Sequence, residues 1–278
     1  SYLGKADEAY KYLHRLGSKG LSLDFVKSEV AFTSIQNDES WGGFELEYLE
    51  RKRAFEESLN HNLVQTLQIL VNRDKLYRAS KTISQDSLAL IDAQNAVILD
   101  TLIKQYGFPG ESLLGVGENG YPEIEPAFYE IIKRQNPENQ TIDFTNLLLE
   151  ASRKGKILPH SAARLIAVIN ANDLFFSRLV YKIQVDSPLA FSHIPNAAKL
   201  NEWVYLKIPE ADERQINELR LNNGMEHLEE YREKVLFSLQ EHRFLLPYKA
   251  FAGVWYVRDA QLANDYLEGT VLANKATR

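Results

Sequence analysis

The sequence contains no cysteine, a single methionine (Met225) and no long apolar run. The absence of cysteine excludes disulfides, thiolate metal ligands and cysteine nucleophiles. No apolar run approaches the roughly 18–20 residues that a membrane-spanning helix needs, so we predict no membrane span. Positive charge is also in deficit, since the formal net charge is −6, and this argues against nucleic acid or an anionic membrane as the main partner.

What is present is typical of a globular protein. Hydrophobic residues make up 45% and charged residues 25% of 278 positions, which excludes disordered and fibrous classes. At about 100–200 residues per domain, this length allows one large domain, or one domain with a smaller attachment. The chain starts at Ser1 rather than methionine. Together with the missing cysteine, this start favours an exported protein, periplasmic or in the cell envelope, over a cytoplasmic one, although a trimmed cytosolic chain fits both features.

Apolar residues recur at steps of three and four through most of the chain, and alternating patterns are nearly absent. We therefore predict an all-α fold, an irregular multi-helix bundle. One apolar stripe from Phe44 to Leu70 predicts a helix of about seven turns. Another helix is predicted from Asp86, with Ser84 as N-cap, to a stop at Gly107.

The C-terminal part is less regular, with prolines at positions 188, 195 and 209. Residues 203–206 predict either a short strand or an extended packing segment. Residues 255–272 predict a last helix. Four aromatic residues near this end predict either a cap on the core or an exposed patch for a partner: Tyr248, Phe251, Trp255 and Tyr256.

Two stretches resemble known families. The first lies within residues 6–49 and comprises Ala9-Tyr10-Lys11-Tyr12-Leu13, Gly17, a helix over 23–30 and Ile35-Gln36-Asn37-Asp38-Glu39-Ser40-Trp41. It resembles the trailing end of tetratricopeptide-like helical repeats in bacterial envelope proteins. The resemblance implies that residues 1–64 form a short repeat-like helical arm, and that a protein partner binds through these N-terminal helices.

The second resemblance covers about residues 65–235 and rests on motifs that come in a fixed order: Asp74-Lys75-Leu76-Tyr77-Arg78, Asp92-Ala93-Gln94-Asn95, Tyr106-Gly107-Phe108-Pro109, Tyr181-Lys182-Ile183-Gln184 and Ile216 through Gly224 to Tyr231. This order is similar to an uncharacterised family of bacterial helical proteins, a domain of unknown function. The resemblance implies a helical domain over 65–278. Where the family has Gln-His-Ala-Asp, this chain has Tyr129-Glu130-Ile131-Ile132-Lys133-Arg134, which implies that any family chemistry is lost here.

The most informative polar residues are Asp92 and Asn95. At about 100° per residue, both lie within the apolar stripe of their helix, and we expect both to be buried. A buried carboxylate without a partner costs several kcal/mol, so Asp92 needs a cation or several donors. The candidate site and its possible partners are Arg78, Asp92, Asn95, Arg134, Arg164, Tyr181 and Gln184.

Two interpretations of this site stay open. The residues either bind a small ligand in a polar pocket or form a satisfied buried network that fixes helix packing. We expect a non-enzymatic binding or protein-interaction module. The alternatives are a degenerate or uncharacterised hydrolase-type enzyme that uses Asp92, and a helical subunit of a cell-envelope complex. The pattern assigns no catalytic residue and leaves the oligomeric state open.

Other motifs predict neither a metal nor a cofactor. Gly115-Val116-Gly117-Glu118-Asn119-Gly120 spells G-x-G-x-x-G, but no strand precedes it and Pro122 follows, so we interpret it as a turn. The histidines form no H-E-x-x-H motif and no paired Glu-x-x-His arrangement. The basic run Arg51-Lys52-Arg53 has acidic neighbours and predicts a solvated helix face.

Overall fold

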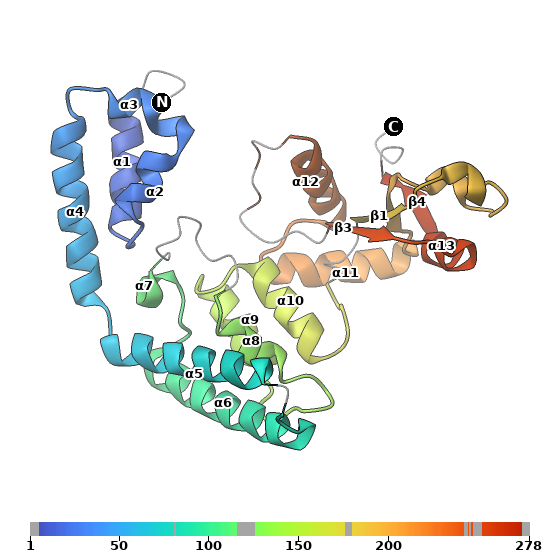
Figure 1. Ribbon diagram of the computed structural model, residues 1–278, viewed down its shortest axis with the longest axis horizontal. Helices are drawn as coiled ribbons and strands as arrows, with labels where there is room; N and C mark the ends of the chain where they lie inside the picture. Colours follow the sequence, from blue (N-terminus) through green and yellow to red (C-terminus); the bar gives the residue numbers. More distant parts are fainter. Residues whose placement is uncertain are drawn as a thin grey trace. The chain divides into compact units, whose positions relative to one another are not determined.

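The structure, a computed structural model, describes residues 6–80, 82–115, 126–175, 180–241, 244, 246 and 252–273. The chain divides into two compact units, Ser1–Phe144 with Lys154–Ile157, and Thr145–Arg153 with Leu158–Arg278 (Figure 1). Within the described residues the chain is mostly helical, as predicted. It also contains a four-stranded sheet, so the prediction of a purely all-α fold is wrong. The predicted division between residues 64 and 65 falls inside a helix of the first unit and stays a prediction.

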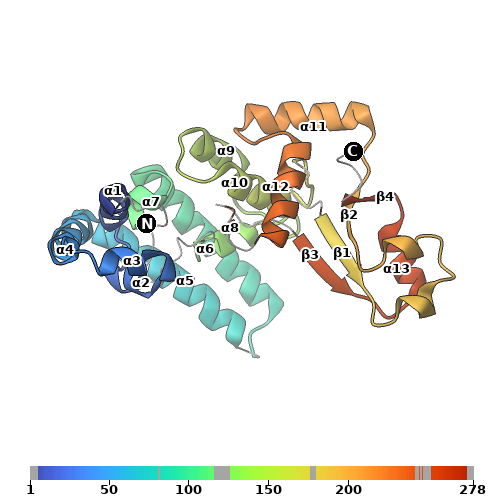
Figure 2. The same ribbon diagram turned by 90° about the horizontal axis from the view of Figure 1, so that it is seen from above.

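The first unit begins with helices packed around aromatic side chains. These elements are α1 (Ala6–Gly17), α2 (Leu23–Ser28), η1 (Val30–Phe32), α3 (Thr33–Gln36) and α4 (Trp41–Ser58), and α1 lies beside α4 (Figures 1 and 2). The Tyr10 ring stacks on Phe44 with centroids 4.9 Å apart. The Tyr48 hydroxyl donates to the Leu21 carbonyl at 3.0 Å, and burial raises the pKa of Tyr48 to about 12. These helices therefore share a core of their own.

The unit continues with α5 (His61–Ala79), α6 (Gln85–Tyr106), α7 (Glu111–Leu114) and α8 (Tyr129–Lys133). The single long helix predicted from residue 44 to 70 is wrong, because α4 ends at Ser58 and α5 starts anew. The Asn60 side chain accepts a hydrogen bond from the Leu63 amide at 3.0 Å, so Asn60 caps α5. The prediction for α6 is confirmed: Ser84 caps its start, and Gly107, with φ 86°, ends it.

The second unit places helices against a small sheet. Its elements are α9 (Thr145–Arg153), α10 (Pro159–Ile169), β1 (Val180–Gln184), η2 (Pro188–Phe191), η3 (Ala197–Lys199), β2 (Trp203–Leu206), α11 (Glu210–Asn222), α12 (Leu228–Gln240), β3 (Ala252–Tyr256), α13 (Ala260–Leu267) and β4 (Thr270–Leu272). The strand order is β3-β1-β2-β4, with β1 parallel to β3 and the other two pairs antiparallel (Figure 2).

The apolar pattern did not predict this sheet because β1, one of its two inner strands, is buried on both faces. Val180 of β1 packs in a cluster with α11 and α12, whereas Ile183 packs in a second cluster with α13. Strands covered on both faces lack the clean alternation that marks a half-exposed strand. The prediction of one helix over 255–272 is also wrong. Asp259 caps the short α13, and Gly269, with φ 68°, turns the chain into β4. Residues 203–206 form a strand, one of the two predicted options.

Some predictions fall outside the described residues. The glycine-rich motif is described only at Gly115, and Tyr248 and Phe251 are not described. Trp255 and Tyr256 are exposed, which favours the patch over the core cap for these two side chains. Among the helices of the described segments, none is long and apolar enough to cross a membrane.

Gly110, at the start of α7, provides a test of packing in the first unit. A Cβ atom at Gly110 would lie 2.4 Å from the Lys156 carbonyl oxygen, whereas one at Gly42 in α4 would meet no atom within 4 Å. We expect Gly110→Ala to lower the free energy of unfolding by about 1–3 kcal/mol through overpacking. The control Gly42→Ala should raise it by up to about 1 kcal/mol through helix propensity. Urea unfolding followed by circular dichroism measures both, and equal stability of the two variants contradicts the packing.

Candidate functional site

Four charged side chains from α5, α6 and the end of α8 meet in the first unit. The Arg78 guanidinium donates to both carboxylate oxygens of Asp92, at 2.5 Å to Oδ1. Its Nε lies 3.7 Å from Oδ1 of Asp74, and Arg134 Nη2 lies 3.8 Å from Asp74 Oδ2. Two carboxylates and two guanidiniums thus form one charge-balanced network, which we call the Asp92 network. The sequence analysis missed Asp74, although it lies one helical turn before Arg78.

The carboxylates of the network are buried, whereas its cations reach solvent. Asp74 and Asp92 are both buried, and the side chain of Arg78 is 30% exposed. Burial lowers the pKa of Arg78, but hydrogen bonding and the charge of Asp92, followed by those of Asp74, raise it above its ordinary value. Arg78 therefore stays charged and neutralises the two carboxylates from one side.

Two buried amides border the network, and they differ in their hydrogen bonding. Gln135 is 0% exposed; its Nε2 donates to the Asp92 carbonyl at 3.3 Å, and its Oε1 accepts from the amides of Thr141 (2.8 Å) and Ile142 (3.1 Å). Asn95 is 1% exposed, and neither of its amide atoms has a hydrogen-bond partner among the described residues. The burial of Asn95 was predicted, whereas nothing in the local pattern marked Gln135.

The predicted site residues fall into two groups. The first unit holds Arg78, Asp92, Asn95 and Arg134. Tyr181 and Gln184 lie on β1 of the second unit. There the Tyr181 hydroxyl donates to the Tyr266 carbonyl at 2.6 Å, and its ring stacks on Trp255 with centroids 4.7 Å apart. The Gln184 carbonyl accepts from the Val257 amide at 3.0 Å. The ligand-binding role of all six residues stays a prediction.

A second buried polar cluster, in the second unit, was missed by the sequence analysis. His160 Nε2 of α10 lies 2.8 Å from Glu226 Oε2, and Arg220 Nε of α11 donates to the Glu226 carbonyl at 2.8 Å. The Arg220 guanidinium also lies 4.9 Å from the ring centre of Tyr231, on which the His160 ring stacks. These contacts join α10, α11 and α12. His160 lies 60 or more positions before Arg220, Glu226 and Tyr231, and this separation hid the cluster, although Arg220 and Tyr231 both belong to the resemblance over 65–235.

The geometry of the Asp92 network favours the structural interpretation over chemistry. Both carboxylate oxygens of Asp92 accept hydrogen bonds from Arg78, so the guanidinium occupies the atoms that a general base would present to a substrate. Neither of the two cavities described below is lined by Asp92. Across the described segments, no group of three or more histidine, aspartate or glutamate side chains is placed to hold a metal ion.

Removal of the Arg78 guanidinium tests the network. We expect Arg78→Leu to lower the free energy of unfolding by at least about 2 kcal/mol, because it leaves Asp92 buried without its cation. The loss should stay below that for a fully buried pair, since Arg78 is partly exposed and Arg134 remains beside Asp74. Lys75→Leu removes an exposed cation from the same helix and should change stability by less than about 0.5 kcal/mol. Equal losses in the two variants, measured by urea unfolding, contradict the network.

The two buried amides give a second test with opposite expected signs. Asn95→Leu removes an amide without a described partner at similar volume, so we expect a higher melting temperature. Gln135→Leu leaves the amides of Thr141 and Ile142 without their acceptor, at about 1–3 kcal/mol for each unsatisfied group, and should lower the melting temperature. Differential scanning calorimetry measures both variants. A melting temperature lowered by Asn95→Leu would show that the Asn95 amide is bound to water or a ligand.

Comparisons of the chain with family models, with curated proteins and with solved structures found no significant match. The resemblance of residues 6–49 to tetratricopeptide-like repeats therefore stays a prediction, as does the resemblance of residues 65–235 to a domain of unknown function. Function must be argued from the contacts, burial and charges of this chain.

Proposed function

We propose that the chain is a non-enzymatic protein-binding module, and that it binds an amphipathic helix on the outer face of the α5–α6 pair. The observation that carries this proposal is a strip of exposed aliphatic side chains on that face. Leu76 is 70% exposed, and the other members are also exposed: Ile69, Leu90 and Val97. Exposed apolar side chains that gather on one face are typical of protein-binding sites.

Contacts between α5 and α6 support the continuity of this strip. Arg78 binds Asp92, and the Arg73 guanidinium binds the Gln94 side chain, so residue numbers rise along α5 while they fall along α6. The two helices, side by side in Figure 1, are therefore antiparallel. One helical turn after the Arg73–Gln94 contact along α5, this alignment pairs Leu76 with Leu90. One turn before the contact, it pairs Ile69 with Val97.

A shallow groove of about 360 Å³ borders this strip and shares Val97 with it, and its other lining residues are Arg73, Ala93, Gln94 and Ile98. Its apolar walls suit the apolar face of a helix, which anchors through residues spaced by three and four. Arg73 has five N–H donors and binds a carboxylate in a fork geometry. The partner is therefore proposed to be an amphipathic helix with an acidic residue beside its apolar stripe.

The Asp92 network supports this function indirectly. Asp74, Arg78 and Asp92 lie on the inner sides of the same two helices whose outer sides form the groove. A surface held rigid before binding loses less conformational entropy when a partner binds. Asp92 is thus assigned a role in fixing the helices rather than in hydrolysis.

We also propose that α1–α4 form the repeat-like arm of a multi-helix bundle. Support comes from their separate core, in which Tyr10, Phe44 and Tyr48 pack without residues from later helices. The partner surface expected on the N-terminal helices differs from the α5–α6 groove. The next experiment tests the groove.

Selection from a library of amphipathic helical peptides, each about 16 residues long with one carboxylate beside the apolar stripe, tests the groove. We expect Leu76→Glu to weaken binding of selected peptides at least tenfold, because it places a charge in the apolar strip. Arg73→Glu should weaken peptides with the carboxylate more than their Gln analogues. Fluorescence anisotropy measures the dissociation constants, and circular dichroism confirms that each variant is folded.

A matched control is available on α4. Leu46 is 68% exposed, almost as much as Leu76. Leu46→Glu adds the same charge at a comparable aliphatic position outside the groove and should change the dissociation constant by less than twofold. Equal weakening by the two glutamate variants, or none by Leu76→Glu, rules out the exposed aliphatic strip of α5 and α6 as the binding surface.

A further inference from the structure

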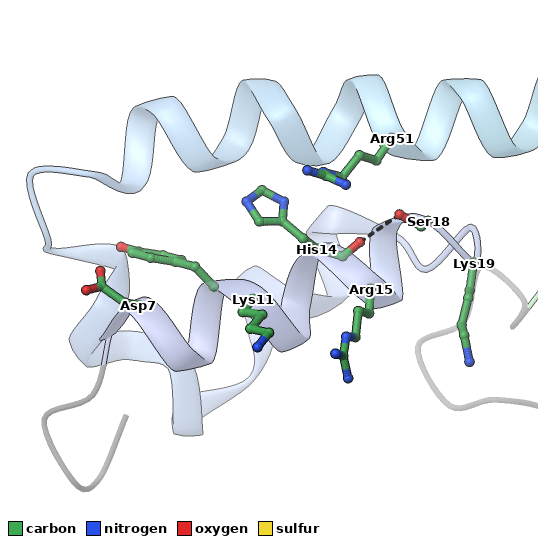
Figure 3. A pocket seen from close by; sticks show the side chains of 8 residues that line it. Asp7, Lys11, His14, Arg15, Ser18, Lys19 and Arg51 are labelled. Carbon is green, nitrogen blue, oxygen red and sulfur yellow. Dashed lines mark hydrogen bonds between the residues drawn. The ribbon is translucent and has the colours of Figure 1, made fainter.

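A larger cavity, of about 660 Å³, lies along α1 and is bordered by α4 (Figure 3). Its cationic lining comes from Lys11 and Arg15 of α1, Lys19 just after α1, and Arg51 of α4. Lys11 and Arg15 are four residues apart and therefore lie on one side of α1. Asp7 is the acidic residue among those that line the cavity. A chain with a net charge of −6 thus gathers four cations around one hollow.

The charges of Lys11 and Arg15 are not balanced by the protein. Within the described part of the chain, neither side chain has a carboxylate partner, although the Arg15 guanidinium lies 5.4 Å from the ring centre of Tyr12. Because both side chains are exposed, they can turn toward a bound anion. Their positive charge is available to a ligand.

The other two cations have exposed carboxylate partners. Arg51 Nη2 lies 3.6 Å from Glu47 Oε2, and Lys19 pairs with Glu111. Such exposed pairs contribute only about 0–1 kcal/mol each, so an anion of higher charge can replace the carboxylate. Neither pair closes the cavity to a ligand.

Aromatic rings form another part of the lining. Tyr10 and His14 line the cavity, and both rings pack on Phe44, with centroids 4.9 Å and 4.8 Å away. Burial lowers the pKa of His14, and the charge of Arg51 lowers it further, against an opposing effect of Glu47. The His14 ring is therefore neutral at neutral pH; its side chain is 18% exposed and its Nε2 lies 3.3 Å from Glu47 Oε2, whereas Tyr10 is buried and offers the ligand only its edge.

We propose that this cavity binds a small organic phosphate. Lys11, Arg15 and Arg51 would hold the phosphate oxygens, because guanidinium groups match phosphate geometry with paired hydrogen bonds. The organic part would lie against Tyr10 and His14. The volume falls in the range of about 300–1,000 Å³ typical of small-molecule sites, and it exceeds the space that a phosphate ion alone needs. This site is independent of the proposed helix-binding groove on α5 and α6.

Titration of the ¹⁵N-labelled chain with phenyl phosphate, followed by NMR, tests the assignment. We expect saturable binding of one phenyl phosphate per chain, with shifts in α1. Phenyl phosphate should bind at least tenfold more tightly than each of three control ligands. Inorganic phosphate lacks the ring, phenol lacks the charge, and benzoate carries a carboxylate in place of the phosphate. No saturation with phenyl phosphate, or equally tight binding of benzoate, overturns the proposal.

Paired charge variants locate the site. The double variant Lys11→Gln with Arg15→Gln should weaken phenyl phosphate binding at least tenfold. The control, Arg53→Gln with Lys75→Gln, removes the same charge from exposed positions that do not line the cavity, and should change binding less than twofold. If the first variant fails to fold, Arg51→Gln replaces it and should weaken binding at least fivefold. Equal weakening in variant and control shows nonspecific attraction and overturns the site.

Discussion

Two carboxylates, Asp74 and Asp92, are buried on α5 and α6, and a buried charge without a partner costs several kcal/mol. The cations that neutralise them come from two places in the chain, Arg78 on α5 and Arg134 at the end of α8. Each guanidinium can reach its carboxylate only when the helices stand at one relative position. Apolar packing alone tolerates small slides between helices, whereas a network with paired atoms does not. This constraint fixes the packing of α5, α6 and α8.

The same constraint determines what these helices present to solvent. Once Arg78 is bound to Asp92 and Arg73 to Gln94, the alignment of α5 with α6 is set, and the proposed pairing of Leu76 with Leu90 on the outer face rests on this alignment. The polar residues inside and the apolar residues outside are therefore parts of one arrangement. In the second unit, Arg220 has a comparable role, since it joins α11 to the carbonyl of Phe175 and to Glu226 before α12. In both units an arginine holds elements together: Arg78 is partly exposed, and Arg220 is fully buried.

The sequence predicted features that depend on neighbouring residues. The cap at Ser84, the stop at Gly107 and the burial of Asp92 all follow from short-range patterns in α6. It failed where distant segments decide the outcome. β1 pairs with β3, which lies far along the chain, and helices cover both faces of β1. A single residue, Asn60, divides what looked like one helix, because an asparagine is compatible with a helix interior but favours a cap. The partner Arg78 was predicted, whereas Gln135 was recognisable only from its three-dimensional contacts.

Arg78 and Arg15 differ in what balances their positive charge. Arg78 receives its countercharge from Asp92 and Asp74, so a ligand anion would have to displace carboxylates whose side chains are only 6% and 8% exposed. Arg15 receives none from a carboxylate of the described residues, and it lies in water beside a cavity. An anion that binds to Arg15 breaks no ion pair of Arg15 and forms one that the protein itself does not supply. The Asp92 network therefore serves as the framework of α5, α6 and α8, and binding is proposed for the open surfaces of α1 and of the α5–α6 pair.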